Sequence, residues 1–174
     1  YTPSYPDSLL SAILKEVKGR IHEFSSAVEF SMIMNALAKL RVNDKALFAR
    51  LGSFATSRMN LEPFHVRELS VIAHAFAVAG HADTNLFEQI ANKARYTISE
   101  ATPQELARLI SAYARLGIAP QSLIDIALHC ATEKLMYMTP AEVVLTAFSL
   151  GQILEFVPIT DSAALGKIFE RLRF

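Results

Sequence analysis

Four polar side chains between residues 104 and 115 recur at the spacing of a single helix face. They are Gln104, Arg108, Ser111 and Arg115. Steps of three and four residues place side chains on the same side of an α-helix. A guanidinium group can bind phosphate oxygens in a bidentate manner, and an amide or a hydroxyl can hydrogen-bond to a base edge or a 2′-hydroxyl. This pattern indicates a surface with the chemistry to contact RNA.

Side chains of the same kind occupy the matching positions in two earlier segments. They are Asn35, Lys39, Arg67 and His74. The column formed by Asn35, His74 and Ser111 is polar and varied, as in modular readers that contact one RNA base per repeat. The neighbouring column of Met32, Val71 and Arg108 is too apolar for a phosphate track. The alternative is a solvated face with no partner, because amphipathic helices expose polar residues in any case.

Residues that could support catalysis or bind a metal do not form a recognisable site in the sequence. His129 and Cys130 are adjacent, so on a helix they point about 100° apart and cannot readily share a metal ion. We interpret them as a buried thiol beside an exposed or hydrogen-bonded histidine. No zinc-protease motif, phosphate-binding loop or nucleophile elbow is present. We therefore expect no enzyme activity, no cofactor and no metal site.

The composition describes an apolar, electrically balanced chain. Its 174 residues are long enough for one domain with its own core, 52% of them are hydrophobic, and the mean hydropathy is +0.27. The 17 basic residues balance 17 acidic ones, whereas a free nucleic-acid binder usually carries a basic surplus. The most apolar stretch, residues 143–159, is broken by polar residues and Pro158, so we expect no membrane span.

Glutamates that precede apolar runs mark a repeat in the chain. Glu29, Glu68, Glu105 and Glu142 are separated by 39, 37 and 37 residues. Three positions before them stand Ser26, His65, Thr102 and Thr139, respectively. Three of these four pairs have the S/T-x-x-E pattern of a capping box, in which a hydroxyl and a carboxylate satisfy the free amides of a helix start. Pro103 and Pro140 then suit the first helical position. The sequence therefore predicts four helix starts with one period.

A small-large-small triplet recurs inside each of these helices and predicts close helix packing. It reads Ala36-Leu37-Ala38, Ala75-Phe76-Ala77, Ala112-Tyr113-Ala114 and, in the last unit, Ala147-Phe148-Ser149. Gly80 and Gly117 are placed to end two of the helices, since a left-handed C-terminal position favours glycine. Met32-Ile33-Met34 and Met136-Tyr137-Met138 could line a groove for a partner, but we expect them to fill the core.

A second helix follows each first helix in register. The pairs Leu47-Phe48, Leu86-Phe87 and Leu123-Ile124 lie 11 and 12 residues after the first alanine of the triplets. We predict an all-α protein, an α-solenoid of about four helix-turn-helix repeats (24–61, 62–98, 99–135 and 136–174), with an insertion near 155–162. Residues 8–23 would form a leading helix, equivalent to a second helix. Stacked pairs of this length make a solenoid because no pair buries its apolar face alone. The alternative is an irregular helical bundle.

The stretch TPQELARLISAYARLG, Thr102 to Gly117, resembles the first helix of octotricopeptide and heptatricopeptide repeats. These units of 37–38 residues occur in organellar proteins and in relatives of FAST-kinase-like proteins with RAP domains. The segments RELSVIAHAFAVAG and VEFSMIMNALAKLR fit less closely, and the last repeat departs from the pattern at Leu154-Glu155-Phe156. The resemblance implies organellar RNA metabolism. No RAP domain is recognisable, so an effector or nuclease-like role has no support.

Two functions from different classes follow from these observations. The first is a non-catalytic RNA-associated repeat protein of the mitochondrion, or alternatively the plastid, built into a ribosome or acting in ribosome or transcript maturation. Its partners would be ribosomal RNA or a transcript together with neighbouring proteins in a large ribonucleoprotein assembly. The second is a protein–protein scaffold of a large organellar complex without direct RNA contact, which the zero net charge and the apolar column of Met32, Val71 and Val78 favour.

Overall fold

The computed structural model describes residues 7–58, 64–158 and 160–173, and α- and 3₁₀-helices are its regular elements. The α-helices are α1 (Asp7–Arg20), α2 (Ala27–Lys39), α3 (Lys45–Ser57), α4 (Val66–Ala79), α5 (Thr84–Thr97), α6 (Pro103–Leu116), α7 (Gln121–Lys134), α8 (Pro140–Ile153) and α9 (Ser162–Glu170). Short 3₁₀ turns are η1 (Ile21–Glu23), η2 (Ile98–Glu100), η3 (Leu135–Tyr137) and η4 (Arg171–Arg173). The predicted all-α class is confirmed.

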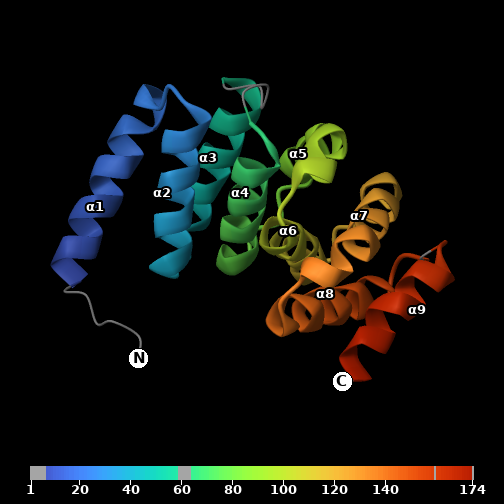
Figure 1. Ribbon diagram of the computed structural model, residues 1–174. Helices are drawn as coiled ribbons and strands as arrows, with labels where there is room; N and C mark the ends of the chain where they lie inside the picture. The colour runs from blue at the N-terminus through green and yellow to red at the C-terminus, as the bar shows by residue number, and fades with distance from the viewer. Residues whose placement is uncertain (1–6, 59–63, 159, 174) are drawn as a thin grey trace.

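The helices form two layers along a twisted array (Figure 1). Helices α2, α4, α6 and α8 pack successively as the layer of first helices, while α3, α5, α7 and α9 form the layer of second helices. In Figure 1, α2 and α4 stand nearly upright and α8 lies nearly across the view, so the stack turns as it advances. Helix α1 leads the array at one end. This arrangement confirms the predicted α-solenoid of four helix pairs and a leading helix over an irregular bundle.

The boundaries predicted for the individual repeats stay predictions. The boundary between residues 61 and 62, and Met59 of the second-helix pattern, lie outside the described residues. The segment predicted as an insertion near 155–162 separates the end of α8 from the start of α9 at Ser162. Within the described part of the chain, no helix has the length and apolar character needed to cross a membrane.

The first helices begin at the predicted caps. In α6 the Thr102 hydroxyl accepts a hydrogen bond from the Glu105 amide at 3.3 Å, and the Glu105 carboxylate accepts one from the Thr102 amide at 2.9 Å. Thr139 and Glu142 make the same pair of bonds at the start of α8. In α2 the Glu29 carboxylate accepts instead from Ser25, one residue before the cap. These bonds satisfy amides that a helix start leaves without intrahelical partners.

Loss of the α6 cap should destabilise the fold measurably. Thr102→Ala removes the hydroxyl that accepts from the Glu105 amide, and we expect the free energy of unfolding to fall by about 1 kcal/mol. Urea unfolding followed by circular dichroism measures the change. Ser99→Ala is the matched control, because the exposed Ser99 binds Lys134 through its carbonyl and not through its hydroxyl. Equal stability of Thr102→Ala and Ser99→Ala would contradict the capping role.

Aspartates cap three second helices, which the sequence patterns did not reveal. Asp44, Asp83 and Asp161 each accept from the amide three residues later, at 3.0, 3.0 and 2.9 Å. Asp83 also explains a glycine in α3. A Cβ added at Gly52 would lie 2.5 Å from Oδ2 of Asp83, so glycine at this position lets α3 approach the start of α5.

The triplet predicted in the last repeat is displaced by two residues. In each repeat, the buried large side chain lies eight residues after the capping glutamate. These side chains are Leu37, Phe76, Tyr113 and Leu150. Leu150 is fully buried, whereas Phe148 is 65% exposed. The small-large-small triplet of α8 is therefore Ser149-Leu150-Gly151, and the prediction of Ala147-Phe148-Ser149 was wrong. The local resemblance of Ala-Phe-Ser to the earlier triplets hid the true register.

Aromatic rings connect one helix pair to the next through the core. Phe48 of α3 contacts Phe76 of α4 at a centroid distance of 5.1 Å, and Phe87 of α5 contacts Tyr113 of α6 at 5.0 Å. Both pairs are edge-to-face, an arrangement that aromatic quadrupoles favour. The Tyr113 hydroxyl donates to the Phe87 carbonyl at 2.7 Å. Burial raises the pKa of Tyr113 well above the usual tyrosine range, so it remains a neutral donor.

Candidate nucleic-acid interface

The first helices hold all eight predicted RNA-contacting residues outside the core. Five of the side chains are exposed: Asn35, Lys39, Arg67, Gln104 and Arg115. The other three are half-buried: His74, Arg108 and Ser111. The apolar residues predicted to turn inward from α6 are Leu106, Leu109, Ile110 and Tyr113, and all are buried. The structure thus separates the core face of α6 from the polar face, as the helical spacing predicted, while contact with RNA stays a prediction.

The clearest clustering lies where α4 and α6 pack together. His74 of α4 has a pKa below the usual histidine value, mainly because it is half-buried, and also because Arg108 and Arg115 of α6 add positive charge nearby. The three side chains come from two helices and lie close enough for their charges to interact. His74 is therefore neutral near pH 7, with one ring nitrogen able to donate and the other to accept a hydrogen bond.

Arg67 and the two arginines of this cluster are not paired with carboxylates. Among the residues that the structure describes, Arg67, Arg108 and Arg115 form no salt bridge, in contrast to Lys18, which pairs with Asp44 at 2.6 Å. Nearby carboxylates are already engaged at helix starts: Glu68 accepts from the His65 amide at 3.1 Å and Glu105 from the Thr102 amide at 2.9 Å. The three guanidinium groups are therefore available to an anionic partner on a chain of zero net charge.

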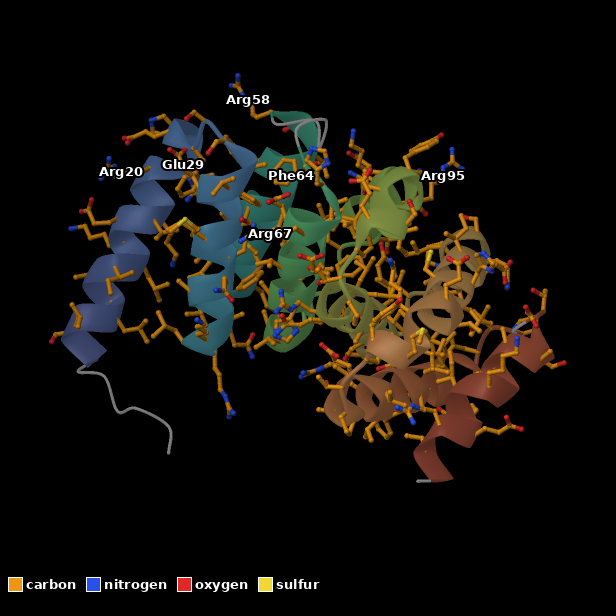
Figure 2. All side chains as sticks on the ribbon, viewed as in Figure 1. Arg20, Glu29, Arg58, Phe64, Arg67 and Arg95 are labelled. Atoms are coloured by element: carbon orange, nitrogen blue, oxygen red, sulfur yellow. The ribbon has the colours of Figure 1, made fainter. Side chains whose placement is uncertain are left out.

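Figure 2 shows how the labelled arginines are distributed over the array. Arg67 lies in the region of α2 and α4, whereas Arg58 and Arg95 lie along the upper edge of the view. Arg95 is engaged locally, since its guanidinium carbon lies 4.7 Å from the centroid of the Tyr96 ring. Arg58 and Arg95 belong to second helices or their ends. These two residues therefore provide a comparison for the arginines of the first helices.

The polar surface is flanked by apolar side chains on α2 and α8. Val28 and Met32 of α2 are 57% and 67% exposed, and Leu145 and Phe148 of α8 are 39% and 65% exposed. Core filling was thus the wrong expectation for Met32, and also for Met136 and Tyr137, which are exposed in η3. Met34 and Met138 are buried as expected. The large residue of each triplet is buried, while the residue two positions before it is exposed or half-buried.

Phe148 occupies the fourth position of the column that Asn35, His74 and Ser111 begin, and the sequence patterns missed it. Asn35, His74, Ser111 and Phe148 each lie six residues after the capping glutamate of their repeat. The distance from the capping glutamate would have placed Phe148 in this column. The displaced triplet had assigned Phe148 to the core, so the column was predicted with three members only.

The remaining candidates for chemistry do not form a site. Cys130 is a buried free thiol with a pKa raised chiefly by burial, and His129 is exposed beside Glu133 at 3.5 Å. Within the described residues, no group of three potential ligands could hold a metal ion. A groove of about 430 Å³ between α1 and α2 is lined partly by Glu23 and Glu29. Glu23 pairs with Arg20 at 2.7 Å and Glu29 accepts from Ser25, so both carboxylates have structural partners.

The lowered pKa of His74 predicts a pH dependence of stability. The unfolded chain, with a histidine pKa of about 6.5, binds a proton more readily than the folded one. The free energy of unfolding should therefore be highest above the unfolded pKa of about 6.5 and should fall as the pH drops from there towards the lower, folded pKa of His74. His74→Gln should flatten this slope in urea unfolding at a series of pH values. His22→Gln, at an exposed site on η1, should leave it unchanged. An identical slope in wild type and His74→Gln would contradict the half-buried site beside two arginines that we assign to His74.

Comparison with known proteins relates this geometry to a family. A comparison with curated proteins gives no match. Comparison with protein families matches residues 8–154 to the RNA-editing substrate-binding complex 6 protein family. The match runs from α1 to the turn after α8 and so includes every first helix of the array. Because the match covers most of its length, this all-helical chain belongs to the RNA-editing substrate-binding complex 6 protein family.

Proposed function

We propose that this chain is a non-catalytic subunit that holds single-stranded RNA on its first-helix layer within an organellar ribonucleoprotein complex. The observation that carries the proposal is the cluster of Arg108 and Arg115 beside His74, positively charged and free of salt bridges among the described residues. Family membership supports an RNA ligand, because the family is described as part of a complex that binds RNA-editing substrates. The zero net charge suits a subunit whose neighbours in the complex supply further contacts.

The family description favours one kind of assembly over another. The sequence led us to expect a mitochondrial ribosome component or a factor in ribosome or transcript maturation, whereas the family description names an RNA-editing substrate-binding complex. We therefore propose a subunit of an RNA-editing complex in the mitochondrion. Rows of stacked helices offer an extended surface for RNA, and the partly buried Arg108 can hold a phosphate with little loss of side-chain freedom.

Salt dependence tests the proposal directly on the chain itself. If Arg67, Arg108 and Arg115 each neutralise one phosphate, the logarithm of the binding constant for single-stranded RNA should fall with the logarithm of salt concentration. The expected slope is about −2, from about −0.7 per phosphate. Fluorescence anisotropy with a labelled RNA of mixed sequence measures it. Absence of binding at low salt, or binding that salt does not weaken, would reject the proposal.

The competing function is a protein–protein scaffold without RNA contact. Its specific support is the exposed apolar surface of α2, where Val28 and Met32 are 57% and 67% exposed. Such a scaffold would bind a neighbouring subunit with little salt dependence and would retain no RNA on purification. The salt titration with RNA therefore separates the two functions, because only the first predicts a steep loss of affinity.

A further inference from the structure

Phe148 is an exposed aromatic side chain in a column that is otherwise polar. The preceding members, Asn35, His74 and Ser111, carry an amide, an imidazole and a hydroxyl, whereas the Phe148 ring is apolar and 65% exposed. An aromatic ring that is this exposed is free to contact a partner. The ring offers a flat face and no hydrogen-bonding group, so the suitable partner is another flat, apolar surface.

The position of Phe148 is not fully covered in the interior helices of the stack either. Helices α4 and α6 have first helices packed on both sides, and their members of the column, His74 and Ser111, are half-buried there and not fully covered. Val144 provides the contrast. Its equivalent in α6, Ala107, is 1% exposed, whereas Val144 is 56% exposed. The position of Val144 is covered by the following helix in a continued stack, whereas the position of Phe148 is exposed in α2 and stays partly exposed in α4 and α6.

The side chains next to this column favour a polyanion as the ligand. Helices α6 and α8 pack against each other and run in the same direction, since each starts an equivalent repeat. Arg108 and Arg115 lie three residues before and four residues after Ser111, the column member of α6. Among the described residues neither arginine has a salt bridge. Cationic groups that track a backbone beside an exposed aromatic ring are the combination that binds single-stranded nucleic acid.

We propose that Phe148 is a stacking platform for a nucleobase of single-stranded RNA whose backbone is held by Arg108 and Arg115. This inference rests on the proposed RNA-binding function. It goes beyond that function because it assigns a base-contacting residue and a mode of contact. Stacking accepts every base, so this position adds affinity without selecting a sequence.

Affinity and salt slope separate stacking from charge. Phe148→Ala should weaken binding of a mixed-sequence single-stranded RNA by roughly 5- to 150-fold and leave the salt slope unchanged, because no phosphate contact is lost. The exposed ring contributes little to the core, so the melting temperature should stay near that of the wild type. Tyr96→Ala is the control, since Tyr96 is 69% exposed on a second helix. Equal affinity of Phe148→Ala and wild type would overturn the stacking role.

A tryptophan probe tests the contact itself. The chain contains no tryptophan, so Phe148→Trp introduces a unique fluorophore that can still stack. We expect the RNA to quench its emission upon binding, with the same midpoint as the anisotropy titration, while Tyr96→Trp emission stays constant. Unchanged emission of Phe148→Trp in RNA-bound protein would overturn the stacking role and leave the apolar surface of α8 to a protein partner. Failure of wild type to bind RNA at all would instead reject the proposed function.

Discussion

Replacing Arg108 and Arg115 together with alanine should weaken binding of single-stranded RNA by roughly 100-fold. The figure follows from about 1.5 kcal/mol for each charge-assisted hydrogen bond to phosphate, which is close to tenfold in affinity per arginine. The salt slope should become shallower by about 1.4, or about 0.7 for each lost phosphate contact. Both side chains lie on the outer face of α6 and outside its core, so unfolding by urea should change little.

The matched control removes the same charge from the other layer of the array. Arg58→Ala with Arg95→Ala also lowers the net charge by two, but these exposed residues belong to second helices or their ends (Figure 2). If affinity depends on a specific first-helix surface, the control double variant should retain most of the binding. Equal losses in the two double variants would show that net charge alone governs binding, and the assignment of the surface to the first helices would then be wrong.

Tyr113→Ala should lower the free energy of unfolding by about 3–5 kcal/mol, the range found when large aromatic side chains are removed from cores. Tyr113 is fully buried, contacts Phe87 at a centroid distance of 5.0 Å, and donates to the Phe87 carbonyl at 2.7 Å. The variant creates a cavity between α5 and α6 and removes the hydrogen bond. Urea unfolding followed by circular dichroism measures the loss.

Two further substitutions divide the contribution of Tyr113 into its parts. Tyr113→Phe keeps the ring and removes only the hydroxyl, so its cost should be about 1 kcal/mol. Tyr96→Ala, at a ring that is 69% exposed, should change stability by less than about 0.5 kcal/mol. A loss in Tyr113→Ala no greater than that in Tyr96→Ala would contradict the role of Tyr113 in joining successive helix pairs.

The helix starts and ends were predictable because their signals are local. Thr102, Pro103 and Glu105 lie within four consecutive residues, and each satisfies or avoids a free amide at the start of α6. Gly80 and Gly117 take the left-handed conformation, with φ of 64° and 65°, that the C-terminal position requires. The aspartate caps of the second helices were not recognised, because Asp83, for example, is not followed three residues later by the glutamate of a capping box.

The candidate site was less predictable because it depends on packing between helices. The repeat register placed His74, Arg108 and Arg115 on outer faces, but their approach across α4 and α6 follows from the stacking of these helices. Phe148 was assigned to the core, since its local sequence imitates the buried triplet two residues out of register. Met32 was also expected in the core, but it lines the groove between α1 and α2 and is 67% exposed. The resemblance to octotricopeptide and heptatricopeptide repeats stays a prediction.

Photo-cross-linking tests most directly the central claim that RNA lies across the first-helix layer. Single-stranded RNA substituted with 4-thiouridine would be irradiated in complex with the chain, and the cross-linked peptides would be identified by mass spectrometry. We predict cross-links within α4, α6 and α8, with those in α8 at or beside Phe148. Cross-links confined to the second helices α3, α5 and α7 would contradict the claim.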